Sequence, residues 1–134
     1  MSDADVAHYL LVLGSAREDA PARVAQARER LSELGELVAS STVVSGPSVS
    51  AGDPHVYANQ AVRLSSSLAR ADLAVALKQL ETTLGRRTDD AACAIDIDLA
   101  REYSAAGHLR WENPAKLAHR LFLQLAAQVE PPPI

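Results

Sequence analysis

The sequence predicts a single α+β domain over residues 1–134. We expect the ferredoxin-like βαββαβ class, with a four-stranded antiparallel sheet, helices on one face and an additional C-terminal helix. Three observations predict this fold. A chain of 134 residues fits one domain. Segments with strand and helix periodicity follow one another in the order β-α-β-β-α-β, and clusters of turn-forming residues separate most of them.

The first strand and the first helix are predicted near the N-terminus. His8–Leu13 is a continuous apolar run, which is typical of a short strand buried on both faces. In residues 18–35, Pro21 suits the first turn of a helix and Gly35 suits its end. The apolar face of this helix comprises Val24, Ala27, Leu31 and Leu34.

Two more strands are expected next in the chain. Glu36–Ser45 is rich in β-branched residues. His55–Ser66 has the alternation of a strand, with Val56, Ala58, Gln60, Val62 and Leu64 on one face and Tyr57, Asn59, Ala61 and Arg63 on the other. Residues 46–54 between them consist of turn-forming residues, so we expect a long loop there.

The remaining elements are a helix, a strand and a final helix. Residues 72–85 have a capping aspartate, a leucine stripe and a terminal glycine, which together predict the second helix. Ala94–Leu99 has a strand pattern, whereas residues 101–112 fit neither period. A third helix is expected to begin at Pro114, with a stripe of Leu117, Leu121 and Leu125.

Composition and charge exclude several classes of protein. The net charge of −4 argues against general nucleic-acid binding, which needs a basic face. The single cysteine, Cys93, has no partner for an internal disulfide and fits a reducing compartment. No basic leader segment is apparent, and no run approaches the roughly 20 apolar residues of a membrane helix. We expect a cytoplasmic monomer that binds neither nucleic acid nor membranes.

The alternation of Asp96 and Asp98 with apolar residues is the main chemical signal. In a strand, Ile95, Ile97 and Leu99 would face the core, while both carboxylates would project from the other face, their Cα atoms about 7 Å apart. Carboxylates this close repel each other, and a divalent cation would remove the penalty. The simpler alternative is a solvated strand face, although aspartate is depleted in strands. We predict a divalent-metal site at these two residues.

Further motifs occur in a fixed order along the chain. They are residues 9–15 (YLLVLGS), Ser40-Ser41, Gly46-Pro47, residues 57–62 (YANQAV), Leu80-Glu81, Gly85-Arg86, residues 95–98 (IDID), and Arg120 with Phe122. In order and spacing they resemble the 6-hydroxymethyl-7,8-dihydropterin pyrophosphokinase family of folate biosynthesis, of which this chain would be a shortened and divergent member. The fold of that family agrees with the predicted order of elements.

The resemblance implies a transferase that moves diphosphate from ATP to the hydroxymethyl group of the pterin and releases AMP. It implies that Asp96 and Asp98 hold two magnesium ions on the ATP phosphates. Arg86 and Arg120 would clamp phosphate oxygens and complete the catalytic set. The nucleotide would also be contacted by Glu81, Arg87 and Arg110. The pterin site would comprise Gly46, Pro47, Tyr57, Asn59 and Phe122, the two aromatic rings enclosing the pterin and the amide recognising its edge.

Among the departures of the chain from the family pattern, two remove groups expected at the nucleotide phosphates. Residues 92–94 read Ala-Cys-Ala instead of Gly-Pro-Arg, and residues 113–115 read Asn-Pro-Ala instead of Pro-His-Pro. A phosphate-binding arginine and a nucleotide-contacting histidine are therefore missing, and such groups contribute strongly to phosphoryl transfer. Nearby groups that could substitute are Arg87, Lys116 and His119.

Three functions therefore stay open: an active ATP- and magnesium-dependent transferase, a degenerate relative that keeps a pterin or nucleotide pocket, and an interaction protein. Single residues have simpler explanations as well. Phe122 could be a core residue, Arg120 could pair with a surface acid, and Trp111 could stack on adenine or seal the core. The Arg86-Arg87 pair follows a predicted helix end, where positive charge offsets the helix dipole.

Overall fold

The computed structural model describes residues 6–49, 52–87 and 92–132. The elements, in chain order, are β1 (Ala7–Ser15), α1 (Ala20–Arg30), the 3-10 helix η2 (Leu31–Glu33), β2 (Glu36–Ser40), β3 (Val44–Pro47), β4 (Val56–Ser66), α2 (Arg70–Thr83), β5 (Asp96–Ser104), β6 (Leu109–Glu112), the 3-10 helix η3 (Pro114–Leu117) and α3 (Arg120–Ala127). The α+β class is therefore confirmed.

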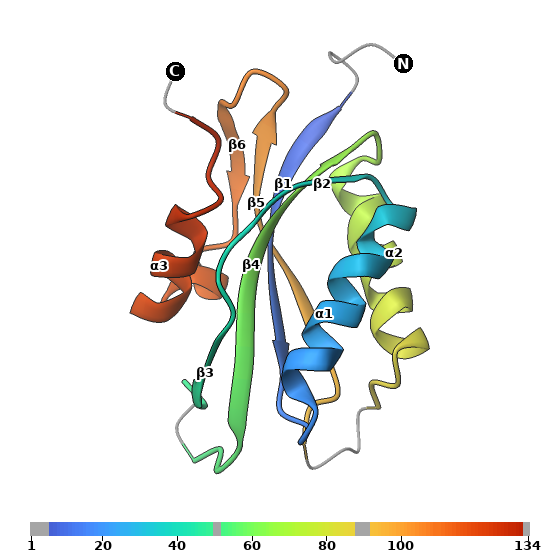
Figure 1. Ribbon diagram of the computed structural model, residues 1–134. Coiled ribbons are helices and arrows are strands. Elements are labelled where there is room, and N and C mark those ends of the chain that lie inside the picture. The colour runs from blue at the N-terminus through green and yellow to red at the C-terminus, as the bar shows by residue number, and fades with distance from the viewer. Residues whose placement is uncertain (1–5, 50–51, 88–91, 133–134) are drawn as a thin grey trace.

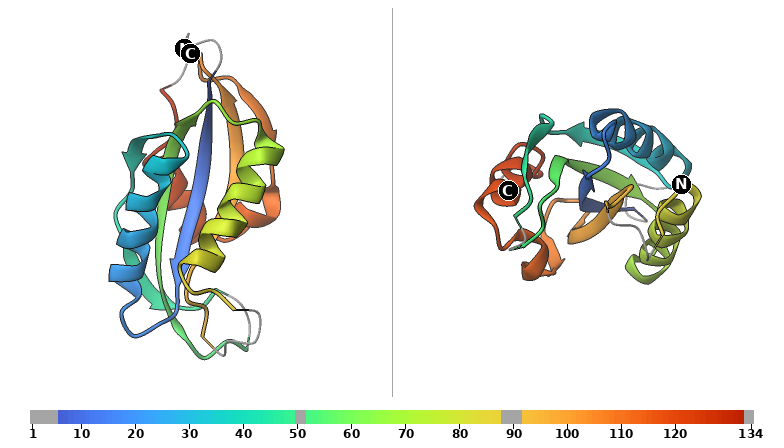
Figure 2. Two further views of the ribbon diagram at one scale, coloured as in Figure 1. Left: turned by 90° about the vertical axis from the view of Figure 1, so that its right-hand side faces the viewer. Right: turned by 90° about the horizontal axis from the view of Figure 1, so that it is seen from below.

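The strands form one antiparallel sheet in the order β2-β4-β1-β5-β6, with β3 also paired to β4. Helices α1 and α2 cover one face of this sheet, and α3 lies on the opposite face (Figure 1). Figure 2 shows this arrangement from two further directions, with the sheet between the helix pair and α3. The sheet has six strands, so the predicted four-stranded ferredoxin-like sheet is not confirmed.

The two additional strands are short and lie toward the edges of the sheet. The predicted strand Glu36–Ser45 is divided because Ser41 leaves the regular ladder: its Oγ accepts the N–H of Ala61 at 2.9 Å, and its own N–H donates to the Ala61 carbonyl at 2.8 Å. The expected loop from residue 46 is wrong in its first residues, because Gly46 and Pro47 belong to β3.

The second additional strand, β6, lies within residues 101–112, whose sequence pattern predicted neither a helix nor a strand. It pairs with β5 across a turn in which Gly107 has a φ of +94°, a conformation that glycine adopts at little cost. The predicted third helix is also interrupted. His119 is extended, and its Nδ1 accepts the N–H of Leu121 at 3.0 Å, so α3 begins anew at Arg120 after the short turn η3.

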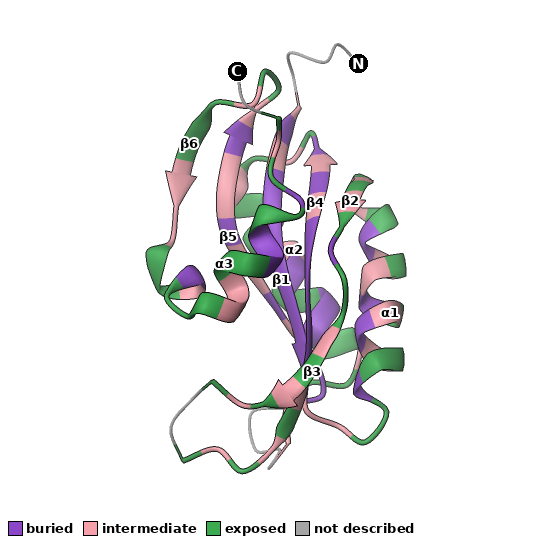
Figure 3. Cartoon of the chain, turned by 60° about the vertical axis from the view of Figure 1, so that its left-hand side comes forward, coloured by how far each residue is buried: buried purple, intermediate pink, exposed green. Residues whose placement is uncertain are grey.

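Two apolar clusters fix the orientation of the strands. Leu11 and Leu13 of β1 pack beneath α1 and α2, whereas Leu10 and Val12 pack against α3, so β1 is buried on both faces as its apolar run predicts. The alternation predicted for β4 is confirmed, since Ala58, Val62 and Leu64 belong to the first cluster and Ala61 to the second. Figure 3 shows the burial of these central strands.

Burial of alternate residues also determines the orientation of β5. Ile95 and Ile97 are buried in the cluster beneath α1 and α2, with exposed fractions of 1% and 5%. Asp96 and Asp98 therefore project from the opposite face of the strand, as the period of two requires. This is the α3 side of the sheet, where the helix is short and leaves part of the face uncovered.

Candidate functional site

Asp96 and Asp98 lie in β5, next to β1, and line a cavity of about 270 Å³. In the sheet, Asp96 is opposite Gly14 of β1, and Gly14 is in turn opposite Asn59 of β4. The lining residues are Val12, Gly14, Ser48, Val49, Tyr57, Asn59, Asp96, Asp98, Ala115, Lys116 and Phe122. A Cβ on Gly14 would lie 2.8 Å from Oδ1 of Asn59, so the absence of a side chain there gives the amide its position.

A second cavity of about 440 Å³ lies on the other side of the two aspartates, toward α2. Its polar lining includes Lys78, Glu81, Arg86, Asn113 and Lys116. Among the described residues, the lining shared by both cavities consists of Asp96, Asp98 and Lys116. The carboxylates therefore stand at the boundary between a cavity with an amide and aromatic rings and a cavity with three cationic side chains.

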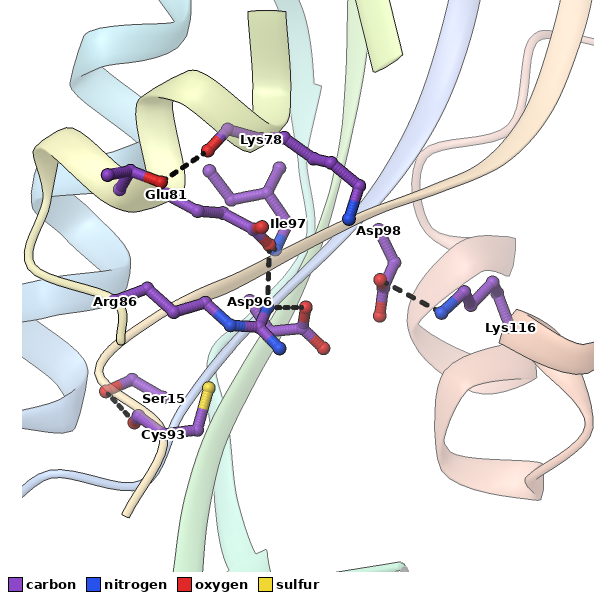
Figure 4. Close-up of polar contacts among 10 residues, drawn as sticks. Ser15, Lys78, Glu81, Arg86, Cys93, Asp96, Ile97, Asp98 and Lys116 are labelled. Carbon is purple, nitrogen blue, oxygen red and sulfur yellow. Dashed lines mark hydrogen bonds and ion pairs between the residues drawn. The ribbon is translucent and has the colours of Figure 1, made fainter. Parts of the chain in front are cut away.

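Asp96 is paired with Arg86, which comes from the connection after α2 (Figure 4). Arg86 Nη1 lies 2.6 Å from Asp96 Oδ1 and 3.0 Å from Glu81 Oε2. Burial acts to raise the pKa of Asp96, but hydrogen bonds from Asp98 and Arg86 outweigh it and hold that pKa below its ordinary value. Asp96 is therefore ionised, and Arg86 is its counter-ion.

Glu81 of α2 contacts both Arg86 and the backbone of β5. The residue is buried, with 7% of its surface exposed, and its Oε2 accepts the backbone N–H of Ile97 at 2.7 Å. Burial raises the pKa of Glu81, although the bond from Ile97 and the charge of Arg86 oppose this. Glu81 links α2 to β5 and holds Arg86, so it supports the second cavity indirectly.

Asp98 has a different environment, with Lys116 of η3 as its counter-ion. Lys116 Nζ lies 3.1 Å from Asp98 Oδ1. Burial, followed by the charge of Asp96, raises the pKa of Asp98 to about 6. Lys116 therefore compensates the charge of Asp98 only in part, and the site carries an electrostatic penalty at neutral pH.

That penalty is the structural reason to expect a divalent cation. Magnesium takes one or two protein carboxylates and leaves its remaining positions to water and phosphate oxygens. The described residues contain no group of three or more His, Cys, Asp or Glu side chains arranged to hold a metal. Asp96 and Asp98 alone therefore fit a cation that is held partly by substrate, and do not fit a closed structural metal site.

Tyr57 is held in the wall of the first cavity by Asp53. The Tyr57 hydroxyl donates to Asp53 Oδ2 at 3.0 Å, and Asp53 Oδ1 accepts the N–H of His55 at 3.0 Å. The bonds from His55 lower the pKa of Asp53 to about 2. Burial and the bond to Asp53 raise the pKa of Tyr57 to about 12, so the phenol stays protonated. The ring is thereby kept at the cavity.

Asn59 and Phe122 complete the recognition groups of this cavity. Asn59 is only 6% exposed, and its amide can both donate and accept hydrogen bonds. Phe122 packs against the apolar cluster beneath α3 and lines the cavity as well, so its core role and a site role are compatible. His119 contacts the ring of Phe122 edge-on, with centroids 6.2 Å apart.

Several residues implied by the resemblance lie outside the two cavities. Gly46 and Pro47 are in β3 and do not line the first cavity, whereas Ser48 and Val49, which follow them, do. Arg87 is exposed at the end of a described segment. Arg120 is exposed at the start of α3 and lines neither cavity.

Arg110 belongs to β6 and lies beside the end of β5 that is remote from Asp96 and Asp98. Its Nη1 is 3.7 Å from Glu102 Oε2, and Arg70 is 2.9 Å from the other oxygen of that carboxylate. Glu102 is six residues beyond Asp96, roughly 20 Å along the strand. Trp111 is stacked beneath Arg70, with the guanidinium 4.6 Å from the ring centroid, so neither Arg110 nor Trp111 is near the aspartates.

The structure also adds residues that the motifs had not placed in the site. They are Gly14, Asp53, Lys78 and Lys116. Gly14 could have been found from the sequence, because it directly follows the apolar run of the first strand. Lys116 was considered only as a possible replacement for the missing histidine, because it lies close to that position in the sequence. The sequence carries no comparable signal for Lys78, which extends from α2 toward β5 (Figure 4).

The fold and the site together define an α+β domain whose acidic centre separates two cavities, a class of site suited to metal-dependent transfer between two substrates. The family model for 7,8-dihydro-6-hydroxymethylpterin-pyrophosphokinase matches residues 10–129. The chain belongs to this family, whose members are diphosphokinases of folate biosynthesis that use ATP, Mg²⁺ and a pterin. A comparison with curated proteins gave no match. Among the described helices, none is long and apolar enough to cross a membrane.

Proposed function

We propose that this chain transfers diphosphate from ATP to the hydroxymethyl group of 6-hydroxymethyl-7,8-dihydropterin and releases AMP. The observation that carries the proposal is the position of Asp96 and Asp98 at the boundary of two chemically different cavities. A reaction between a neutral heterocycle and a polyanion needs one cavity of each kind and a centre of charge compensation between them.

The first cavity is the proposed pterin site. Asn59 can recognise a ring edge that carries both an amino and a keto group, because an amide donates and accepts. Tyr57 and Phe122 offer aromatic surface for stacking, and both line the cavity. The protonated Tyr57 hydroxyl, engaged by Asp53, holds its ring in one orientation. These residues bind and orient the pterin so that its hydroxymethyl group is directed toward the aspartates.

The second cavity is the proposed site of the ATP phosphates. Arg86, Lys78 and Lys116 supply positive charge along it, and the buried Glu81 holds Arg86 in place. Asp96 and Asp98 would hold two magnesium ions, which when bound would neutralise charge on the phosphate chain. The protein residues position the β-phosphorus in line with the pterin hydroxyl. The new bond forms between that oxygen and the β-phosphorus as the bond from this phosphorus to the AMP oxygen breaks, and the hydroxyl proton passes to water.

The direct test is AMP release from ATP in the presence of hydroxymethyl-dihydropterin and magnesium. The control protein is the double variant Asp96→Asn with Asp98→Asn, which keeps the size of both side chains but removes both charges. We expect AMP from the unaltered chain and a loss of at least about a thousandfold in the variant, since charge-stabilising groups at such sites contribute on this scale. Equal AMP release from the two proteins would refute the proposal.

One observation favours a second function, a binding module without transfer. Ala115 lines the first cavity, but residues 113–115 lack the histidine of the family pattern, and Ala92-Cys93-Ala94 lacks its arginine. A module of this kind would bind the pterin or a non-hydrolysable ATP analogue, as measured by calorimetry, and would release no AMP. Binding of neither ligand would exclude both functions and leave the two aspartates as surface charges.

A further inference from the structure

Lys116 lies at the boundary between the two cavities. Its ammonium lies 3.1 Å from Asp98 Oδ1, and its side chain lines both cavities together with the two aspartates. Figure 4 shows Lys116 reaching Asp98 from the side opposite to α2 and Arg86. The two acidic residues therefore have separate counter-ions that come from different elements of the fold.

The backbone of Lys116 is held by hydrogen bonds, whereas its side chain is partly exposed. The N–H of Asn113 donates to the Ala100 carbonyl at 2.9 Å, and the N–H of Lys116 donates to the Asn113 carbonyl at 3.1 Å. Leu117 is buried beneath α3, with 4% exposed. The Lys116 side chain itself is 40% exposed. A lysine has a flexible four-carbon stem, so its ammonium can leave Asp98 and still remain at the boundary of the cavities.

The two counter-ions differ in how strongly they are held. Arg86 contacts Asp96 and also the buried carboxylate of Glu81, so it keeps an acidic partner if Asp96 changes its contacts. Within the described part of the chain, Lys116 has Asp98 as its acidic partner and no second one. A divalent cation at Asp98 would repel the ammonium at this short distance. Lys116 is therefore the cation that metal binding would displace.

We infer that Lys116 is an exchangeable counter-ion, which neutralises Asp98 in the metal-free protein and transfers to the phosphate chain of the nucleotide when Mg²⁺ binds. This inference rests on the proposed function and adds a positioning residue to it. The displaced ammonium stays beside the cavity proposed for the phosphates. There the phosphate chain replaces Asp98 as its negatively charged partner. Lys116 thus links metal binding to nucleotide binding.

The test uses Lys116→Gln and measures binding of Mg²⁺ alone and then of a non-hydrolysable ATP analogue at saturating Mg²⁺, both by calorimetry. Without the competing ammonium, the affinity for Mg²⁺ should rise by about two- to fivefold, the equivalent of one partly exposed ion pair. The affinity for the analogue should fall by about tenfold, because a charge-assisted contact is lost. A purely structural role would not shift the two affinities in opposite directions.

Two further variants complete the test. Lys116→Arg keeps the charge and should restore both affinities toward those of the unaltered chain. Arg30→Gln removes one positive charge from an exposed pair with Glu33 and should change neither affinity, which controls for net charge. An unchanged or weaker affinity of Lys116→Gln for Mg²⁺ would overturn the inference, as would an unchanged affinity for the analogue.

AMP release by the unaltered chain is measured separately, so that the two proposals can fail independently. Opposite shifts in a chain that releases no AMP would support the role of Lys116 and reject catalysis. AMP release without opposite shifts would reject the role of Lys116 alone. An unaltered chain that binds no Mg²⁺ in the absence of nucleotide would reject the role of Lys116, and AMP release would still decide the proposed function.

Discussion

The buried carboxylate of Glu81 accepts the backbone N–H of Ile97 at 2.7 Å, between the two aspartates of β5. An acid on a helix thus fixes the position of the strand that carries the proposed metal ligands. The same oxygen, Oε2, lies 3.0 Å from Arg86 Nη1. The geometry of the acidic centre therefore depends on the contact between α2 and β5 as well as on the strand itself.

This contact gives the first prediction. Glu81→Ala should lower the free energy of unfolding by about 1–3 kcal/mol, because the N–H of Ile97 would remain buried without an acceptor. Glu81→Gln keeps a carbonyl oxygen for that N–H and should lower the free energy of unfolding less. Urea denaturation of the three proteins measures the difference. Equal losses in the two variants would show that the bond to Ile97 is not the stabilising contact.

The second prediction concerns the charge of Asp98 in the absence of metal. Its pKa of about 6 in the folded state exceeds the ordinary value of 3.8. The folded state therefore binds more protons in this range, and stability falls as pH rises through it. Above pH 6 the penalty is complete. Asp98→Asn should then stabilise the metal-free protein by something on the order of 1 kcal/mol, while abolishing Mg²⁺ binding.

Thermal unfolding in a chelator, above and below this range of pH, is the measurement. Asp19→Asn is the matched control, because it removes a carboxylate whose partner, Arg23, is an exposed neighbour on α1. It should not stabilise the protein at any pH. A lower melting temperature for Asp98→Asn above pH 6 would contradict the assignment of the penalty to Asp98.

The third prediction concerns His8, which is remote from the site. Arg63 Nη1 lies 2.9 Å from His8 Nδ1, and burial followed by the charge of Arg63 lowers the pKa of His8 below 6.5. The unfolded chain then takes up the proton first, so stability should fall as pH decreases below 6.5. His8→Gln should reduce this loss, which thermal unfolding of both proteins across a series of pH values would measure. Parallel pH profiles would argue against the effect.

The fourth prediction tests the wall of the proposed pterin cavity. A Cβ at Gly14 would come within 2.8 Å of Asn59 Oδ1, so Gly14→Ala must displace the amide. We expect a loss of about tenfold in pterin affinity, equivalent to one hydrogen bond, with the fold retained. Calorimetry with the pterin measures the loss. Gly46→Ala is the comparison, since a Cβ there meets no atom within 4 Å. Its effect on affinity should be the smaller of the two.

The strands and helices with clear periodicity were predictable because burial imposes the pattern directly. The central residues of β1, Tyr9–Leu13, are apolar since both faces of the strand are covered, and β4 alternates since its two faces meet different surroundings. The short strands β3 and β6 were not predictable from pattern. Each has four residues and exists through pairing with a longer neighbour, so its signal lies in β4 or β5 rather than in its own sequence.

The sequence likewise predicted one part of the candidate site and not another. The period of two placed Asp96 and Asp98 together on one face of a strand, and the order of motifs indicated the family. The positions of the arginines were not determined in this way. Arg86 reaches Asp96, while Arg110 pairs with Glu102 at the far end of β5, because contacts of long side chains depend on which elements pack nearby.

By itself, the sequence determined the α+β class, the family and the presence of two carboxylates on one face of a strand, because these follow from local periodicity and from motifs in a fixed order. Only the tertiary structure decided that those carboxylates lie between two cavities, that Gly14 makes room for Asn59, and that Lys116 forms an ion pair with Asp98. Such relationships join segments far apart in the chain, and packing of the whole sheet with its helices brings them within contact distance.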